Sequence, residues 1–310
     1  MEYLHNNRAE FLTAINLTTE KYGVLPAVAE KDYYVTLILK GLAERLPFIV
    51  FKGGTSLSKC HKVIKRFSED IDVAIDEKLT QSQQKKVKEA IKATAEELAL
   101  SIPNLDETRS RRSYNQYVIA YHSVLGEEDN AAPPKVLLET TTFEVSFPTV
   151  ILPVHSYIGD MMEEEAPEAI EGFLLEPFTM KVQDLDRTLI DKTFAICDYY
   201  MSGATERHSR HLYDIAKLLP AIHITSELDA LIDDVRDDRR KSKNNPSAQL
   251  NHDIPKMLKE IIDSHFYESD YNNVTKKLLY EDVSYEEAIG NGIAKVADMD
   301  IFEYKKILTE

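Results

Sequence analysis

The sequence lacks a long apolar run: no window reaches the roughly 18 uninterrupted apolar residues that a membrane span needs. Its first residues, MEYLHNNRAEF, are charged and lack the apolar core of a signal peptide. Cysteine is scarce too, because only Cys60 and Cys197 occur, far apart, so no disulfide framework is indicated. These absences predict a cytoplasmic protein without a membrane partner.

Basic residues are in the minority. The 310 residues carry a formal net charge of −16, which argues against a surface coated with positive charge for nucleic acid. Local clusters do occur in TRSRRSY, which holds Arg109, Arg111 and Arg112, and in RRKSKNN at 239–245. Each is most simply a solvated surface, and the alternative that they frame a groove for a phosphate backbone stays open. The pair His208 and His211 lacks further ligands at a recognisable spacing, so zinc is not predicted there.

The periodicity of apolar residues predicts two differently built halves. In the first half we expect helices at 7–20, 27–46, 57–66 and 80–100 and strands at 48–51, 70–76, 114–124 and 135–145. In the second half we expect helices at 184–201, 207–220, 225–238, 252–265, 272–280 and 284–297. The prediction is therefore an α+β protein, with a mixed-sheet domain at 1–165 and a mainly helical domain at 166–310.

Two acids alternate in the strand at 70–76. Asp70 and Asp72 project to the same face of a strand, while Ile71 packs on the other face. Carboxylates that close repel each other, and a divalent cation relieves the repulsion. Oxygen ligands suit Mg²⁺, or Mn²⁺ in its place. Glu139, an acid inside an apolar strand, is the candidate for a third ligand.

A Gly-Gly-Thr-Ser turn precedes this strand. Gly53 and Gly54 allow a polyphosphate to approach the backbone, while Thr55 and Ser56 offer hydroxyls to phosphate oxygens. The segment is not a Walker A loop, which requires Gly-Lys-Ser/Thr at a fixed spacing. Positive charge follows closely at Lys59 and Arg66, which we add to the nucleotide-binding candidates. An Asp-x-Asp pair or a glycine turn alone is commonly a solvated edge or a plain turn. The succession of strand, turn, helix and Asp-x-Asp strand is what indicates a site.

Four segments together resemble the AbiEii/AbiGii group of abortive-infection toxin nucleotidyltransferases, which includes the MenT toxins and belongs to the DNA polymerase β-like superfamily. They are EKDYY at 30–34, GGTS with RFSEDID at 53–72, DKTFAI at 191–196 and RHSRHLYDIAKLL at 207–219. The last departs from the pattern of many members, because the first acid of an Arg-Asp-Tyr-Tyr-Asp run is missing before Asp214.

The resemblance implies a polymerase β-like domain and a helical domain that completes the active-site cleft. It implies metal-dependent transfer of an NMP from an NTP to an acceptor hydroxyl, with Asp70, Asp72, Lys192 and Asp214 as catalytic residues. Lys192 would contact the triphosphate, and Asp214 would hold Lys192 in place or touch the nucleotide. The alternatives are a surface lysine for Lys192 and, for Asp214, a helix salt bridge with Arg210 or Lys217.

The resemblance also implies the toxin of a toxin–antitoxin system, neutralised by a separately encoded antitoxin, with RNA such as tRNA as acceptor. Two alternatives stay open. One is a small-molecule nucleotidyltransferase of the antibiotic-modifying kind. The other is a non-catalytic module that binds nucleotide without turnover.

Overall fold

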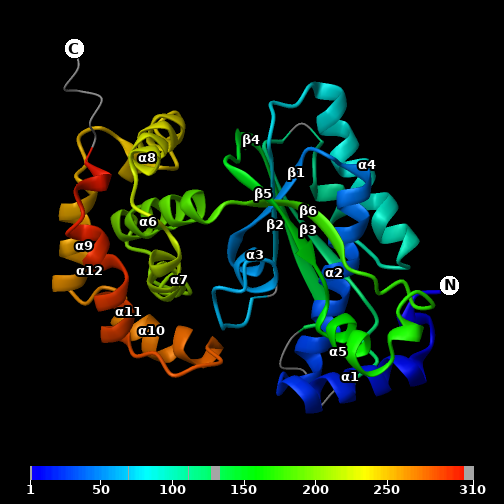
Figure 1. Cartoon of the computed structure of the whole chain (residues 1–310). Helices are drawn as coiled ribbons and strands as arrows, with labels where there is room; N and C mark the ends of the chain where they lie inside the picture. Colours follow the sequence, from blue (N-terminus) through cyan, green and yellow to red (C-terminus); the bar gives the residue numbers. More distant parts are fainter. Residues whose placement is uncertain (1, 69, 111, 127–132, 304–310) are drawn as a thin grey trace. The chain divides into compact units, whose positions relative to one another are not determined.

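The computed structural model describes residues 2–68, 70–110, 112–126 and 133–303 (Figure 1). The chain divides into two compact units, one formed by residues 1–61 and 68–182 and the other by residues 62–67 and 183–310. The division after Val182 differs from the predicted domain boundary after residue 165, because a strand at 178–183 joins the sheet of the first unit. Helices of the described residues are too short or too polar to cross a membrane.

The first unit is built on a six-stranded mixed sheet with strand order β3-β4-β2-β1-β6-β5. Its strands are β1 (Ile49–Lys52), β2 (Ile71–Ile75), β3 (Tyr114–Ala120), β4 (Lys135–Val145), β5 (Thr149–Val154) and β6 (Phe178–Gln183). Strand β2 runs antiparallel to β1 and parallel to β4, which confirms the predicted α+β class with a mixed sheet. The strands β5 and β6 were not predicted; β5 lies at the sheet edge and contains Pro153, which weakens a strand signal in the sequence.

The helices of the first unit are α1 (Arg8–Tyr22), α2 (Pro26–Arg45), α3 (Gly53–Lys59), α4 (Gln81–Glu97) and α5 (Tyr157–Glu165). In Figure 1, α2 and α4 run beside the sheet, and α2 packs on both α4 and β4. The predicted helix at 57–66 is wrong in position, since α3 begins at Gly53 and ends at Lys59. A backbone φ of +82° at Gly53 lets the chain pass directly from β1 into this helix.

Helix α2 holds α3 in place through the EKDYY segment. Asp32 pairs with Lys59 of α3 at 2.6 Å and accepts a hydrogen bond from the Tyr157 backbone N–H at 2.8 Å. The neighbouring Tyr33 and Tyr34 are buried, and Tyr34 stacks on Tyr121 with ring centroids 4.2 Å apart. The segment therefore connects α2 to the helix that carries the glycine turn.

The second unit is helical. Its helices are α6 (Leu185–Met201), α7 (Arg210–Leu218), α8 (Ser226–Arg239), α9 (Ile254–Asp263), α10 (Glu268–Asn273), α11 (Tyr285–Asn291) and α12 (Ile293–Ala297). The helix expected at 284–297 is interrupted at Gly292, where an added Cβ would lie 2.7 Å from the Ala288 carbonyl oxygen. The helix expected at 272–280 is instead a 3₁₀ turn at Thr275–Leu278.

The segment at 62–67 belongs to the second unit although α3 and β2, which flank it, belong to the first. It pairs with the chain after the 3₁₀ turn. The Phe67 N–H donates to the Leu278 carbonyl at 2.8 Å, and the Tyr280 N–H donates to the Lys65 carbonyl at 2.9 Å. The chain thus inserts six residues into the helical unit and delivers Arg66 there.

Candidate active site

Three carboxylates lie on neighbouring strands of the first unit. Asp72 on β2 is the register partner of Glu139 on β4, and Asp70 directly precedes β2. Register partners on adjacent strands present their side chains on the same face of a sheet. All three acids are partly exposed. The structure therefore places Glu139 beside Asp72.

Strand β3 adds two polar side chains next to these acids. Gln116 is the register partner of Glu139 and donates a hydrogen bond to its carboxylate at 2.9 Å. The pKa of Tyr114 is raised by burial and then by Glu139, with smaller contributions from Asp72 and Asp70. Tyr114 therefore lies close enough to the three acids for their charges to contribute to this shift. Gln116 could not be predicted from the sequence, because its position opposite Glu139 depends on strand register.

The glycine turn lies directly against Asp72. An added Cβ at Gly53 would lie 2.0 Å from Oδ2 of Asp72, and the φ of +82° disfavours any other residue. Lys52 is the register partner of Asp72 on the adjacent strands β1 and β2. It is also the N-cap residue of α3, where its side chain makes no capping hydrogen bond. The predicted succession of turn and acids is therefore one compact arrangement, with the N-terminus of α3 beside the Asp72 carboxylate.

The hydroxyls of the turn are used to build it. Thr55 is buried; its Oγ1 donates to the Asp70 carbonyl at 2.6 Å and lies 2.9 Å from the Ser68 hydroxyl. Ser56, also buried, donates to the Gly53 carbonyl at 2.9 Å. Contact of either hydroxyl with phosphate would require these bonds to be given up. The structure therefore gives Thr55 the task of fixing the backbone of Asp70.

Lys59 does not contact the glycine turn or the sheet acids through its ammonium group; its contacts among the described residues lie elsewhere in the first unit. Its ammonium lies 2.6 Å from Asp32, 2.9 Å from the Thr36 hydroxyl and 2.9 Å from the His155 carbonyl. These three partners match the three N–H donors of a lysine. We therefore assign Lys59 to the packing of α3, which corrects its expected role in nucleotide binding.

The second unit contains a buried charged centre formed by Arg66, Lys192 and Asp214. The Arg66 guanidinium binds both carboxylate oxygens of Asp214 at 2.7 Å, and Lys192 Nζ donates to Oδ2 of Asp214 at 2.6 Å. Asp214 is fully buried, and Lys192 is only 7% exposed. The structure therefore places Asp214 where it holds Lys192, and neither the surface lysine nor the local helix salt bridge is observed.

The electrostatics of this centre follow from two cations on one carboxylate. Burial would raise the pKa of Asp214, but Arg66 and Lys192 outweigh it and hold that pKa far below its ordinary value. Burial lowers the pKa of Lys192, which Asp214 partly offsets. His211 lies nearby and is half-buried, and its pKa is lowered well below 6.5 by burial and then by Lys192. The centre thus places two cationic side chains, Arg66 and Lys192, around one buried carboxylate.

The predicted basic clusters are largely engaged with the protein itself. Arg109 and Arg112 donate to the backbone carbonyls of Asp106 and Glu107, and Arg111 lies outside the described residues. In the second cluster, Arg239 pairs with Asp191 at 3.3 Å and with Asp198 at 2.9 Å.

Donor chemistry decides which ion the three sheet acids suit. They offer carboxylate oxygens only, and hard oxygen donors fit Mg²⁺ or Mn²⁺. The ligand atoms of the three sheet acids, which are all described residues, do not all lie within 4.8 Å of one another. Within the described residues, the group that meets this limit is His155, Asp160 and Glu163.

The sequence model of the AbiEii family, described as nucleotidyl transferase toxins of type IV toxin–antitoxin systems, matches residues 37–291. The chain therefore belongs to this family and is a nucleotidyltransferase toxin. Among solved structures, the chain is similar to the nucleotidyltransferase toxin MenT4 from Mycobacterium tuberculosis, at 15% identity and a TM-score of 0.49. That alignment covers 96% of this chain and 89% of the other. No curated protein matches the sequence.

Membership of this family implies an NTP substrate, a divalent metal and an antitoxin partner. The matched region contains the glycine turn, the three sheet acids and the buried centre.

Proposed function

We propose that this toxin transfers an NMP from an NTP to an acceptor hydroxyl, with Asp70, Asp72 and Glu139 holding Mg²⁺ or Mn²⁺. The observation that carries the proposal is the register of Asp72 with Glu139, together with the glycine turn packed on Asp72. The metal, when bound, neutralises the charge that develops on the transferred phosphoryl group and on the leaving pyrophosphate.

The turn at the start of α3 has a separate task in this proposal. The backbone N–H groups at Gly53 and Gly54 bind phosphate oxygens, because a glycine has no side chain of its own to cover these donors; the Asp72 carboxylate fills the space beside Gly53. Thr55 and Ser56 keep this turn and the Asp70 backbone in position through their buried hydrogen bonds.

Lys192 is proposed to stabilise negative charge on the triphosphate. Its support is the buried centre, in which the ammonium is fixed by Asp214 while Arg66 neutralises most of that carboxylate. An ammonium fixed in this way loses little freedom when it meets a phosphate, which favours electrostatic stabilisation of the transition state. Arg66 and Asp214 then act as positioning residues for Lys192.

For the acceptor we propose an RNA, tRNA first, and for the biology a toxin that arrests growth until its antitoxin neutralises it. Support for RNA is limited to the basic segment at 108–114 and to the resemblance of the motifs. A protein that uses NTPs and tRNA works where both are abundant, so the proposal places it in the cytoplasm.

The direct test is incubation of the purified chain with each labelled NTP, Mg²⁺ and total tRNA, followed by separation of RNA from free nucleotide. We expect label from one NTP to appear in RNA, and to disappear when a chelator is added. Label in a small molecule would replace RNA with the antibiotic-type alternative. Nucleotide binding without any transfer would identify a non-catalytic module.

Salt dependence tests the RNA acceptor separately. If Arg109 and Arg112 contact a single-stranded backbone, the slope of log affinity against log salt falls by about 0.7 for each contact removed. The double variant Arg109→Ala, Arg112→Ala should therefore bind tRNA more weakly, with a shallower slope and unchanged NTP affinity. An unchanged slope would remove this segment from the acceptor site.

A further inference from the structure

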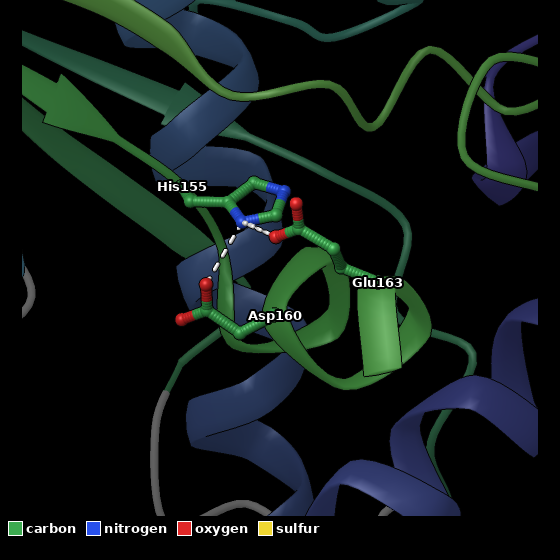
Figure 2. Close-up of side chains that lie close together, drawn as sticks. All are labelled: His155, Asp160 and Glu163. Carbon is green, nitrogen blue, oxygen red and sulfur yellow. Dashed lines mark hydrogen bonds and ion pairs between the residues drawn. The ribbon is translucent and has the colours of Figure 1, made fainter. Parts of the chain in front are cut away.

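A second cluster of ligand-type side chains lies in the first unit, where β5 leads into α5. Figure 2 shows His155 with its ring edge toward Asp160 and Glu163, which project from the first turns of α5. Nδ1 of His155 lies 2.8 Å from Oδ1 of Asp160 and 3.8 Å from Oε2 of Glu163. The ligand atoms of all three residues lie within 4.8 Å of one another. One imidazole nitrogen thus faces two carboxylates.

The other ring nitrogen is already engaged. Nε2 of His155 lies 2.7 Å from the Leu175 carbonyl oxygen, which can only accept a hydrogen bond, so Nε2 carries a proton. A neutral ring in this position has its lone pair on Nδ1, toward Asp160 and Glu163. Metal-binding histidines in proteins almost always donate their second N–H to a carboxylate, a backbone carbonyl or water, which fixes the tautomer and the ring orientation.

The local backbone also fixes the ring. An added Cβ at Gly159 would lie 2.2 Å from Nε2 of His155, so the imidazole packs into space that any other residue would fill. The Ser156 side chain caps α5 by accepting from the Gly159 N–H at 2.9 Å, and the His155 carbonyl accepts from Lys59. The histidine is thus held on its backbone and on one nitrogen, and only Nδ1 faces the acids.

We propose that His155, Asp160 and Glu163 bind a divalent first-row metal ion, with Zn²⁺ as the preferred occupant. Three protein ligands with water in the fourth position are a common zinc arrangement. Imidazole favours zinc over magnesium, which separates this site from the all-carboxylate site on the sheet. The carboxylates of Asp160 and Glu163 are 39% and 61% exposed, so an ion has a path from solvent. The metal would join the end of β5 to α5 and to the chain at Leu175.

The competing interpretation is an ion pair without metal. Burial lowers the pKa of His155, but Asp160 and the Leu175 carbonyl together outweigh it, so the pKa is raised overall. A charged ring would then pair closely with Asp160 at 2.8 Å and only weakly with Glu163, which is 3.8 Å away and largely exposed. The metal site therefore requires the Glu163 carboxylate as a ligand, whereas the ion pair does not depend on it.

The test is a calorimetric titration of ZnCl₂ into the chelator-treated full-length chain. All proteins in the test carry Asp72→Asn, so that the sheet acids contribute little to zinc binding. The informative variant is Glu163→Gln. Its matched control is Glu165→Gln on the same helix, where Glu165 is 62% exposed and Lys21 keeps a second partner in Glu164.

We expect one equivalent of zinc in the parent and in the Glu165→Gln control, and an affinity at least about 10-fold weaker in Glu163→Gln. Mg²⁺ should bind this site more weakly than Zn²⁺ in the same titration. Absence of zinc binding in the parent, or equal affinity in Glu163→Gln, would overturn the proposal and leave the ion pair. Because the readout is binding in an Asp72→Asn background, its failure says nothing about nucleotide transfer.

Discussion

The two charged groups of this toxin are built in opposite ways. The sheet acids Asp70, Asp72 and Glu139 share one sign of charge and keep partial access to solvent. The centre of the helical unit combines both signs, and Asp214 is 0% exposed within it. Like charges that reach solvent can recruit a cation, whereas a buried carboxylate must be neutralised within the protein. The comparison predicts that replacing a sheet acid should cost activity, and that removing the buried carboxylate Asp214 should cost stability.

The largest effect is expected for Asp72→Asn. Loss of a metal ligand removes several kcal/mol of transition-state stabilisation, which corresponds to about a 10³-fold or larger fall in the rate of NMP transfer. The melting temperature should stay near that of the wild type, because asparagine has the same shape. Asp237→Asn, on the surface pair with Arg240, serves as the control. Full activity in Asp72→Asn would refute the metal assignment on the sheet.

Asp214→Asn should give the largest loss of stability. It removes the buried carboxylate that Arg66 and Lys192 share, and breaking a buried pair in this way costs about 3–5 kcal/mol. Urea unfolding followed by circular dichroism measures the change. A second substitution, Lys192→Met, removes the buried ammonium that has lost this carboxylate and should restore part of the loss. A decrease of less than about 1 kcal/mol in the free energy of unfolding of Asp214→Asn would mean that water reaches the centre.

Lys192→Met alone tests whether this residue of the buried centre contributes to NMP transfer or to stability. Asp214 keeps both hydrogen bonds from Arg66, so the free energy of unfolding should change little. Transfer should fall by about 10²–10³-fold, the usual result of losing one group that stabilises a developing negative charge. Lys217→Met, which removes a more exposed pair with Glu281, is the control. Normal transfer by a destabilised Lys192→Met protein would assign Lys192 a purely structural role.

Gly53→Ala should affect both stability and activity, since the glycine contacts Asp72. A non-glycine residue with positive φ costs roughly 1–2 kcal/mol, and the new Cβ would in addition displace the Asp72 carboxylate. Gly23→Ala is the matched control, because Gly23 has a φ of +66° and open space around it. Thermal melts should show a loss in both variants, with transfer reduced only in Gly53→Ala. Equal rates of transfer in Gly53→Ala and Gly23→Ala would mean that the glycine turn is not part of the active site.

The smallest effect concerns pH. The pKa of half-buried His211 is lowered, so below about pH 6.5 the unfolded chain takes up a proton that the native protein does not. The free energy of unfolding should therefore decrease as the pH falls from about 6.5, by up to about 1.4 kcal/mol per pH unit from this group. His211→Gln should have a flatter profile in urea unfolding at pH 7.5, 6.5 and 5.5. Parallel profiles would show that His211 is not the group responsible.

The sequence could predict elements whose signal is local. Periodicity located α1, α2 and α4 and the strands β1 to β4, and alternation placed Asp70 and Asp72 on one strand face. The edge strand β5 was not predicted, because a proline interrupts its pattern. Helix α3 was predicted at the wrong position, because it begins at Gly53, within the segment interpreted as a turn, and ends at Lys59. Local preference shows that a helix is present more reliably than it shows where the helix begins.

Partners across long separations were decided by the tertiary structure. The sequence grouped Lys59 and Arg66 with the glycine turn because they are close along the chain. In the fold, Lys59 binds Asp32, and Arg66 binds Asp214, 148 residues away. Glu139 could be proposed from its chemistry, but only strand register places it opposite Asp72. Residue type and spacing thus determined which side chains could do chemistry, and burial and register decided which of them meet, because both depend on the packing of the whole chain.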